Sequence, residues 1–238
     1  MDQETFERPK IANPGGGHMA CVLLLDTSSS MEGQAIDNLN QAIGDFTKHL
    51  AADEMVKKCL DICIVTFASD ANVAVPFTPI SQFEPVALKA FGSTAMSSGI
   101  HLAIDQIKER NRLYNDLGTP VYMPWIFMIT DGMPNANDDI DGAQQRVQLE
   151  ESKGTQGKLK FLAMGVPGYD KATLVKLTRH QGDNPRIMET QNLDFAPVLK
   201  WIADSMKVIS VSRVGDTPVL PRLPVAVRRI DPQDTGAW

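Results

Sequence analysis

Oxygen-bearing side chains follow a short apolar run near the start of the chain. The run Val22–Leu25 stops at an acid, and oxygen atoms recur at alternate positions in Asp26, Ser28 and Ser30. An apolar run of this length bounded by polar residues is typical of a buried strand in a parallel sheet. In open α/β sheets, ligands gather beyond the carboxyl ends of such strands. We therefore expect these three side chains to line a loop at the functional edge of the fold.

The chemistry that this spacing suits is coordination of a hard divalent cation. A carboxylate and two hydroxyls at steps of two residues can direct several oxygens toward one point. Mg²⁺ prefers oxygen ligands in near-octahedral geometry at about 2.0–2.1 Å. One carboxylate and two neutral hydroxyls leave the ion under-neutralised, so it still attracts an outside anion. The alternative is an ordinary strand-to-helix loop, in which Asp and Ser side chains cap the next helix.

Two further stretches favour a cation site over a capping loop. The segment Phe91–Met96 places Thr94 just before a helical pattern. A second apolar run, which begins at Trp125, ends in another acid, Asp131, followed by Gly132. Polar side chains thus follow two apolar strands and precede one helix, in positions where a sheet edge can gather them.

Taken together, these motifs resemble those of the von Willebrand factor A (VWA) domain family. Their order and spacing are similar to its metal-ion-dependent adhesion site (MIDAS), and the resemblance runs from about residue 20 to about residue 207. The segments 26–31, 92–96 and 122–134 look most similar to bacterial cytoplasmic VWA proteins of the tellurium-resistance-associated TerY type. Ser29 stands where many relatives carry Gly, which leaves the ligand set intact but reduces the freedom of the loop backbone.

The resemblance implies a site for Mg²⁺, or for Mn²⁺ or Ca²⁺, and a protein partner. The implied metal ligands are Asp26, Ser28, Ser30, Thr94 and Asp131. The hydroxyls would bind the ion directly, and the two acids directly or through water. In the family a partner's Asp or Glu completes the shell, and binding can couple to movement of the C-terminal helix, here about 194–207. TerY-type relatives imply a partner in a bacterial stress or tellurite-resistance system, including a protein kinase or phosphatase.

The alternation of apolar strands with helical patterns predicts an α/β fold with a doubly wound, mostly parallel central sheet and helices on both faces. The expected strands are 20–25, 60–67, 72–77, 123–130, 158–166 and 186–189. The resemblance implies that 72–77 is a short antiparallel edge strand. We expect three parts: an N-terminal arm (1–18), a VWA domain (19–210) and a proline-rich extension (211–238). The extension is too rich in proline for a helix, and either packs along the domain as an extended strand or serves a partner.

Composition narrows the function further. The net charge of −6 argues against a nucleic-acid binder, and no apolar run reaches the length of a membrane span. The polar N-terminus is no signal peptide, so a cytoplasmic location is expected. Cys21, Cys59 and Cys63 fit small buried core residues better than a disulfide framework or a zinc site.

A metal-dependent hydrolase or phosphatase-like enzyme is the alternative to a binding module. A haloacid-dehalogenase-type site would need a second Asp where Ser28 stands. A serine nucleophile would need a nearby His, but the four histidines lie away from the expected strand ends: His18, His49, His101 and His180. A scaffold with an unused metal site is a third possibility. Asp138, Asp139 and Asp141 favour a solvated loop that caps the helix from about residue 142, rather than a second metal site.

Overall fold

The computed structural model describes residues 11, 13, 15–152, 159–179, 186–190, 192–225 and 227–229. Its strands are β1 (Met19–Asp26), β2 (Leu60–Phe67), β3 (Ala71–Pro79), β4 (Trp125–Thr130), β5 (Lys160–Gly165), β6 (Ile187–Thr190) and β7 (Val227–Arg229). Its α-helices are α1 (Gln34–Ala51), α2 (Glu54–Cys59), α3 (Met96–Asp116), α4 (Ile140–Ser152), α5 (Lys171–Thr178) and α6 (Ala196–Ser210). Short 3-10 turns cover Ser29–Met31 and Ile80–Gln82.

The described strands form one sheet in the order β3-β2-β1-β4-β5-β6-β7. β1, β2, β4, β5 and β6 run parallel, whereas β3 pairs antiparallel with β2 at one edge. At the other edge β7, from the proline-rich extension, pairs antiparallel with β6. The predicted fold class is confirmed, with this second antiparallel edge strand as an addition.

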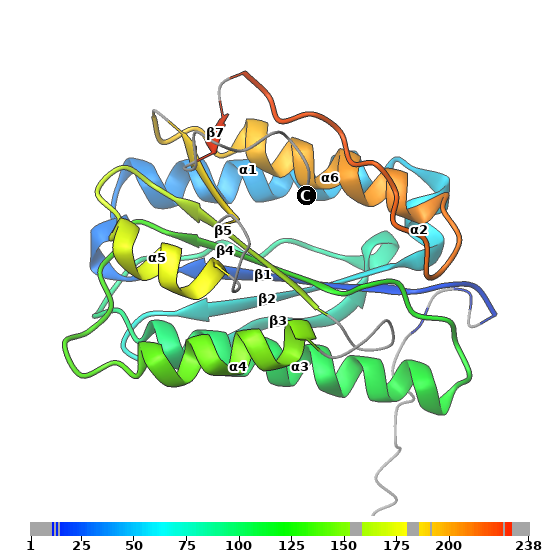
Figure 1. Cartoon of the computed structure of the whole chain (residues 1–238). Coiled ribbons are helices and arrows are strands. Elements are labelled where there is room, and N and C mark those ends of the chain that lie inside the picture. Colours follow the sequence, from blue (N-terminus) through cyan, green and yellow to red (C-terminus); the bar gives the residue numbers. More distant parts are fainter. Residues whose placement is uncertain are drawn as a thin grey trace, which may run out of the picture.

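Helices cover both faces of the sheet (Figure 1). Alternate side chains of β1 point to opposite faces, so Leu23 and Leu25 pack with α1 and α6, whereas Val22 and Leu24 pack with α3, α4 and α5. All eight residues of β1 are buried, which explains why this strand reads as an unbroken apolar run. The two apolar layers hold β1 in the middle of the molecule and thereby fix where Asp26, its last residue, is presented.

Most predicted elements lie within two residues of their observed bounds. α2 was not predicted, because it spans only Glu54–Cys59; Asp53 starts it by accepting hydrogen bonds from the backbone N–H groups of Met55 and Val56 at 3.0 and 3.1 Å. The three cysteines are buried free thiols, as expected. No described helix is both long enough and apolar enough to cross a bilayer.

A buried ionic cluster ties β2 to α3 at the amino end of the parallel strands. Asp61 of β2 accepts hydrogen bonds from Arg110 Nη2 at 2.6 Å and from the Tyr114 hydroxyl at 2.5 Å. His18 packs on Tyr114, with its Nδ1 3.8 Å from Asp61 Oδ2. Burial opposes ionisation of Asp61, but Arg110 and the hydrogen bonds overcome it and hold the pKa of this carboxyl below its usual range.

Arg110→Ala is expected to lower the free energy of unfolding by about 3–5 kcal/mol at neutral pH, because it leaves the buried Asp61 carboxylate without its cation. The depressed pKa of Asp61 means that its stabilising effect is present above the pKa of the unfolded chain, about 4, and is lost as pH falls through the folded value. The difference between wild type and Arg110→Ala should therefore shrink in acid. Urea unfolding between neutral pH and pH values below about 4 measures it. Arg112→Ala, at an exposed position of the same helix, is the control; equal losses for both variants would contradict the role of the pair.

Candidate metal centre

Asp26 lies at the carboxyl end of β1 with its carboxylate fixed by three hydrogen bonds. Oδ1 accepts from the backbone N–H of Ser28 at 2.8 Å and from its hydroxyl at 2.6 Å. Oδ2 accepts from the Thr130 hydroxyl at 2.6 Å. The β1–β4 register pairs Leu25 with Ile129, so Asp26 and Thr130 are the next neighbours across the two strands. Strand pairing therefore sets the orientation of this acid.

A chain of hydroxyls leads from Asp26 to the second acid. The Ser28 and Ser30 Oγ atoms are 3.0 Å apart, and the Ser30 hydroxyl donates to Asp131 Oδ1 at 2.7 Å. Ser28 is buried, whereas Ser30 is exposed. Four of the five predicted ligands thus form one continuous series of close oxygen contacts that runs from the core to the surface.

The fifth predicted ligand, Thr94, reaches the same place across Gly132. A Cβ atom on Gly132 would lie 3.3 Å from Thr94 Oγ1 and 3.3 Å from Asp26 Oδ2. The Thr94 hydroxyl and the Asp26 carboxylate therefore lie within twice that distance of each other, and a side chain at position 132 would crowd both. The structure brings the five predicted residues together; whether they bind a metal stays a prediction.

Backbone hydrogen bonds join the loop that follows β1 to the segment that carries Thr94. Phe91 N–H donates to the Thr27 carbonyl at 2.8 Å, and Ser29 N–H donates to the Gly92 carbonyl at 3.0 Å. These bonds place residues 91–94 alongside residues 27–29. The long connection from β3 to α3 is thereby held against the site, which explains how Thr94 arrives there from a segment without regular secondary structure.

The loop after β4 is hydrogen-bonded to the start of α3 and to Thr94. Thr94 N–H donates to Asn135 Oδ1 at 3.1 Å, and Asn135 N–H donates back to the Thr94 carbonyl at 3.0 Å. Asp138 accepts from the backbone N–H of Ser97 at 3.1 Å and from its hydroxyl. The residue that precedes α3, Ala95, has no capping side chain, so Asp138 supplies that cap from a distant loop.

Predictions for the acidic loop were correct in part. Asp139 accepts a hydrogen bond from Gly142 N–H at 2.9 Å, so it caps the next helix as expected, although α4 begins earlier, at Ile140. Asp138 caps α3 instead. Asp141 pairs with Lys176 on the surface. Among the residues that the structure describes, no group of three or more His, Cys, Asp or Glu side chains is arranged to hold a metal.

Asp26 differs from the other buried acids in its partners. Among the described residues, the buried carboxylates are Asp26, Asp61, Glu150 and Glu151. Arg110 pairs with Asp61, Lys108 with Glu150 and Arg186 with Glu151, at 2.6, 3.6 and 2.6 Å. Asp26 accepts hydrogen bonds only from hydroxyls and backbone N–H groups in the described structure, and no Lys or Arg pairs with it. A buried carboxylate without a cation is costly.

Burial raises the pKa of both acids in the site. For Asp26, hydrogen bonds from Ser28 and Thr130 offset part of the rise. For Asp131, the Ser30 hydroxyl lowers the pKa, while the nearby Asp26 charge raises it further. Two carboxylates that repel each other at a partly buried site favour a positive ion between or beside them.

The hydroxyl geometry fits such an ion. The Ser28 and Ser30 hydroxyls each have one proton, and each can donate it to a carboxylate, so the 3.0 Å contact between their oxygens retains no proton of its own. The lone pairs of these two hydroxyl oxygens therefore face one another, an arrangement that a bound cation would stabilise. Adjacent ligands of an octahedral ion with bonds of about 2.0–2.1 Å are about 2.9 Å apart. The observed spacing therefore suits two neighbouring Mg²⁺ ligands.

The described histidines do not pair with these serines. His18 lies in the buried cluster at the other end of the sheet, His49 contacts Asp204 and Lys207, and His101 contacts Arg146. His180 lies outside the described residues. No described His is thus in position to act as a base for Ser28 or Ser30.

Sequence reasoning missed three residues that position the site: Thr130, Asn135 and Asp138. Thr130 was visible as the residue beside Asp131, and its role follows once β1 and β4 are paired. Asn135 and Asp138 gave no such signal, because their partners lie on α3 and just before it, 41 residues earlier in the chain.

Residues 21–133 match the family model for the von Willebrand factor type A domain, and all five predicted ligands lie within this range. Among curated proteins, none matches the chain.

Several solved structures share the fold at low sequence identity. The vWF domain of the type V pili tip protein Mfa5 from Porphyromonas gingivalis has a TM-score of 0.60 and 14% identity, over 84% of this chain and 98% of that chain. The pilus adhesin SpaC from Lactobacillus rhamnosus GG, in an open conformation, has a TM-score of 0.62 and 11% identity, over 82% and 31%. Proximal thread matrix protein 1 from the mussel byssus, with a zinc-occupied MIDAS motif, has a TM-score of 0.51 and 19% identity, over 84% and 47%. The present chain spans about half the length of the mussel protein, and these likenesses show the fold alone.

Asp138→Ala is expected to lower the free energy of unfolding by about 1–2 kcal/mol, the usual effect of losing a helix cap, because it removes the acceptor for Ser97 N–H and Ser97 Oγ. Chemical denaturation of wild type and variant measures the change. Asp141→Ala removes a nearby acid, in the first turn of α4, that forms a surface ion pair with Lys176, and should have the smaller effect. Similar losses for both variants would show that Asp138 has no special role at α3.

Proposed function

We propose that the von Willebrand factor A (VWA) domain of this chain binds a divalent cation at the carboxyl edge of its sheet and uses the ion to hold a carboxylate of a partner protein. The observation that supports this most directly is Asp26, a buried acid with no Lys or Arg partner in the described structure, joined through two serine hydroxyls to Asp131. A bound cation supplies the positive charge that the described chain does not.

The donor set fits Mg²⁺ better than it fits zinc. Mg²⁺ takes hard oxygen ligands, and the five side chains offer oxygen only. Ser28, Ser30 and Thr94 would hold the ion, and Asp26 and Asp131 would bind it directly or orient bound water. Mn²⁺ and Ca²⁺ suit the same ligand types. The mussel protein with zinc in its MIDAS motif supports the expectation that a VWA site of this kind accepts a divalent ion.

The charge of the site supports a carboxylate as the ligand from outside. With three neutral hydroxyls in direct contact and the two acids acting through bound water, a divalent ion keeps enough of its charge to attract an anion at an open position. Ser30 is exposed and Asp131 is half-buried, so a ligand can approach from solvent. An Asp or Glu side chain of a protein satisfies this requirement.

The identity of the partner rests on resemblance alone. The TerY-like stretches lead us to propose a protein of a bacterial stress or tellurite-resistance system, with a kinase or phosphatase among the candidates. A role in catalysis would need a base, and the described residues place no His beside Ser28 or Ser30. A binding module is therefore the better account of the site.

Ser30→Ala is expected to weaken Mg²⁺ binding by about ten- to hundredfold, because it removes an exposed ligand and the hydrogen bond that orients Asp131. Isothermal titration calorimetry with Mg²⁺ and Mn²⁺ measures the affinity. Ser29→Ala is the matched control, because Ser29 is an exposed neighbour whose hydrogen bonds in the described structure are made by its backbone: its N–H donates to the Gly92 carbonyl and its carbonyl accepts from Glu32 N–H, and Ala keeps both. Absence of any titration with the wild-type protein, or equal affinities for both variants, would refute the proposed site.

Capture of a partner should depend on the same ion. In a pull-down from the source cells, a protein retained in Mg²⁺ should be lost in EDTA and with Ser30→Ala, yet kept with Ser29→Ala. The reason is that the partner's carboxylate would bind the ion rather than the protein surface. Retention of the partner that is unchanged by EDTA would favour a scaffold with an unused metal site. Mg²⁺-dependent hydrolysis of p-nitrophenyl phosphate would favour the alternative of a phosphatase-like enzyme.

A further inference from the structure

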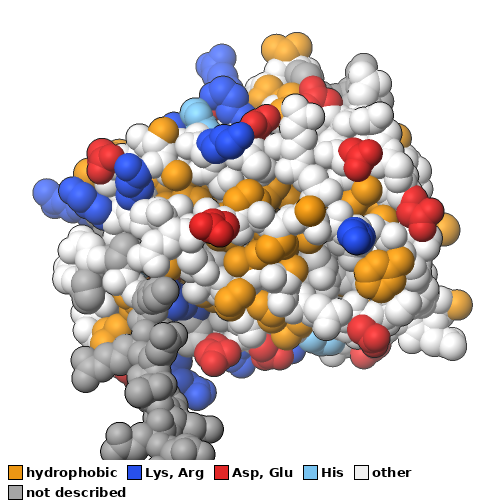
Figure 2. Space-filling model, turned by 180° about the vertical axis from the view of Figure 1, so that it is seen from behind, with side chains coloured by type: hydrophobic (Ala, Val, Ile, Leu, Met, Phe, Trp, Pro, Cys, Tyr) orange, Lys and Arg blue, Asp and Glu red, His pale blue; other side chains and the backbone are white. Residues whose placement is uncertain are grey.

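An apolar groove opens beside the candidate metal centre, at the edge of the sheet that β3 forms. It has a volume of about 330 Å³. Its apolar lining consists of Ala68, Ala74, Val86, Ala87, Leu88 and Phe91. Figure 2 views the molecule from the side of β3 and shows hydrophobic side chains exposed on this face among polar and charged ones. The volume is at the low end for a ligand pocket and suits one or two side chains of a peptide.

The groove is continuous with the loop that carries the metal ligands. Thr27 lines the groove and stands between Asp26 and Ser28 in the chain. Its carbonyl accepts the hydrogen bond from Phe91 N–H at 2.8 Å, and its own N–H donates to the Phe67 carbonyl at 2.9 Å. A ligand bound at the metal and a group bound in the groove would therefore touch the two sides of one loop.

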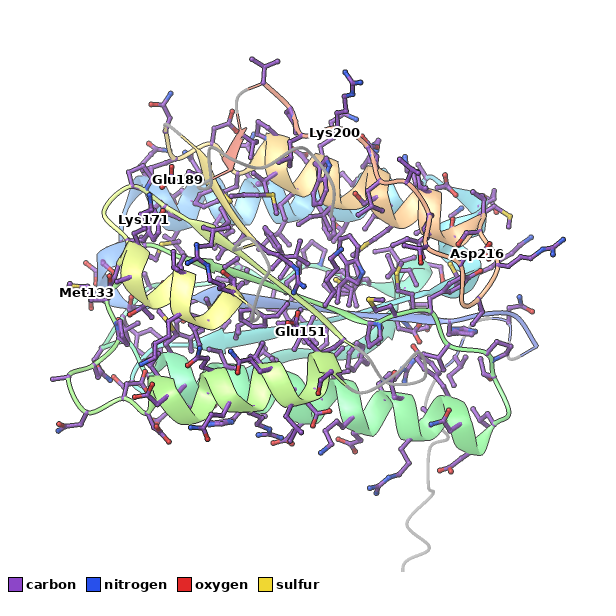
Figure 3. All side chains as sticks on the ribbon, in the orientation of Figure 1. Met133, Glu151, Lys171, Glu189, Lys200 and Asp216 are labelled. Carbon is purple, nitrogen blue, oxygen red and sulfur yellow. The ribbon has the colours of Figure 1, made fainter. Side chains whose placement is uncertain are left out.

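The side chains around the centre are unusually exposed for their type. Phe91 is 61% exposed and Val86 41% exposed on the groove side, and Met133, which follows Gly132, is 69% exposed. Figure 3 shows Met133 pointing outward at the same end of the sheet as Glu189 and Lys171. Large apolar side chains grouped at a rim are characteristic of a surface that a partner covers.

The walls of the groove are fixed before any partner binds. Asn40 of α1 holds Leu88 by two hydrogen bonds: Leu88 N–H donates to Asn40 Oδ1 at 2.8 Å, and Asn40 Nδ2 donates to the Leu88 carbonyl at 3.0 Å. Ala95 N–H donates to the Ala68 carbonyl at 2.7 Å. A preformed groove loses little freedom on binding, so apolar contacts made in it add to affinity.

The charges of the groove do not select for a charged occupant. Asp70 and Lys89 are its two charged lining residues, and their signs are opposite. We propose that the partner presents its metal-binding Asp or Glu next to a large apolar side chain, and that this side chain fills the groove between Val86, Ala74 and Phe91. The proposal rests on the proposed function, since the carboxylate must bind the ion. The ion then recognises charge and the groove recognises size.

Carboxylates with and without an apolar tail test the proposal. The probes are acetate, phenylpropionate and phenylpentanoate, titrated into the Mg²⁺-loaded full chain and followed by NMR. A phenyl tail that reaches the groove should raise affinity over acetate by at least about tenfold, because it buries an aromatic ring. In Val86→Ser the ratio of the two affinities should fall toward unity. Leu149→Ser, which alters an exposed apolar residue of α4 (57% exposed), should keep the wild-type ratio.

The outcomes separate this proposal from the metal site. Equal affinities of all three acids for the wild-type chain, or a tail advantage that survives Val86→Ser, would overturn the groove and leave the metal site standing. A tail advantage that persists in EDTA would show that the groove binds apolar groups without the ion, and would also overturn the proposal. A chain that binds no Mg²⁺ would overturn the proposed function, and the groove proposal with it. Circular dichroism of each variant confirms that it is folded.

Discussion

The structure depends most on the position of one buried carboxylate, that of Asp26. The β1–β4 register puts Thr130 beside it, and the turn after β1 folds Ser28 back onto it. At the opposite end of the sheet the chain neutralises a buried acid itself, by pairing Asp61 with Arg110. At the carboxyl end, the described residues place only hydroxyls and backbone N–H groups around Asp26. The same fold thus contains one acid that serves stability and one that is left for an outside charge, and this difference suggests a binding role for the carboxyl end.

Short sequence patterns predicted the features of the structure that depend on neighbouring residues alone. The apolar run before Asp26 is buried on both faces of the sheet and could be recognised from composition alone. The positions of Ser28 and Ser30 follow from a turn of a few residues. The approach of Thr94 could be inferred only with the help of family resemblance, because a segment without regular structure carries it and bonds such as Ser29 N–H to the Gly92 carbonyl hold it in place.

The features that prediction missed depend on contacts between distant segments. The sequence suggests that Asp138 caps α4, the helix that follows it. Its carboxylate instead caps α3, and nothing near position 138 in the sequence indicates this. The sequence of the proline-rich extension is compatible with either an extended strand or a partner-binding segment. The three residues of β7 show no periodicity of their own, and their strand pairing is with β6. The groove beside the site is likewise invisible in the sequence, because its walls come from β2, β3 and a loop that Asn40 fixes from α1.

Binding that depends on both an ion and a groove can be specific for its partner and still reversible. A single ion–carboxylate contact at a site open to solvent orients its ligand well. It selects poorly between partner proteins, since every acidic surface carries carboxylates. A groove of about 330 Å³ is too small to hold a partner alone, because the apolar area that it can cover offsets little of the entropy lost on association. Each element is weak without the other, so binding that needs both is specific and still reversible when the ion leaves. The hydrogen bonds from Asn135 and Asp138 to the start of α3 fit this arrangement, because they hold Thr94 in place while the ion and the partner bind and leave.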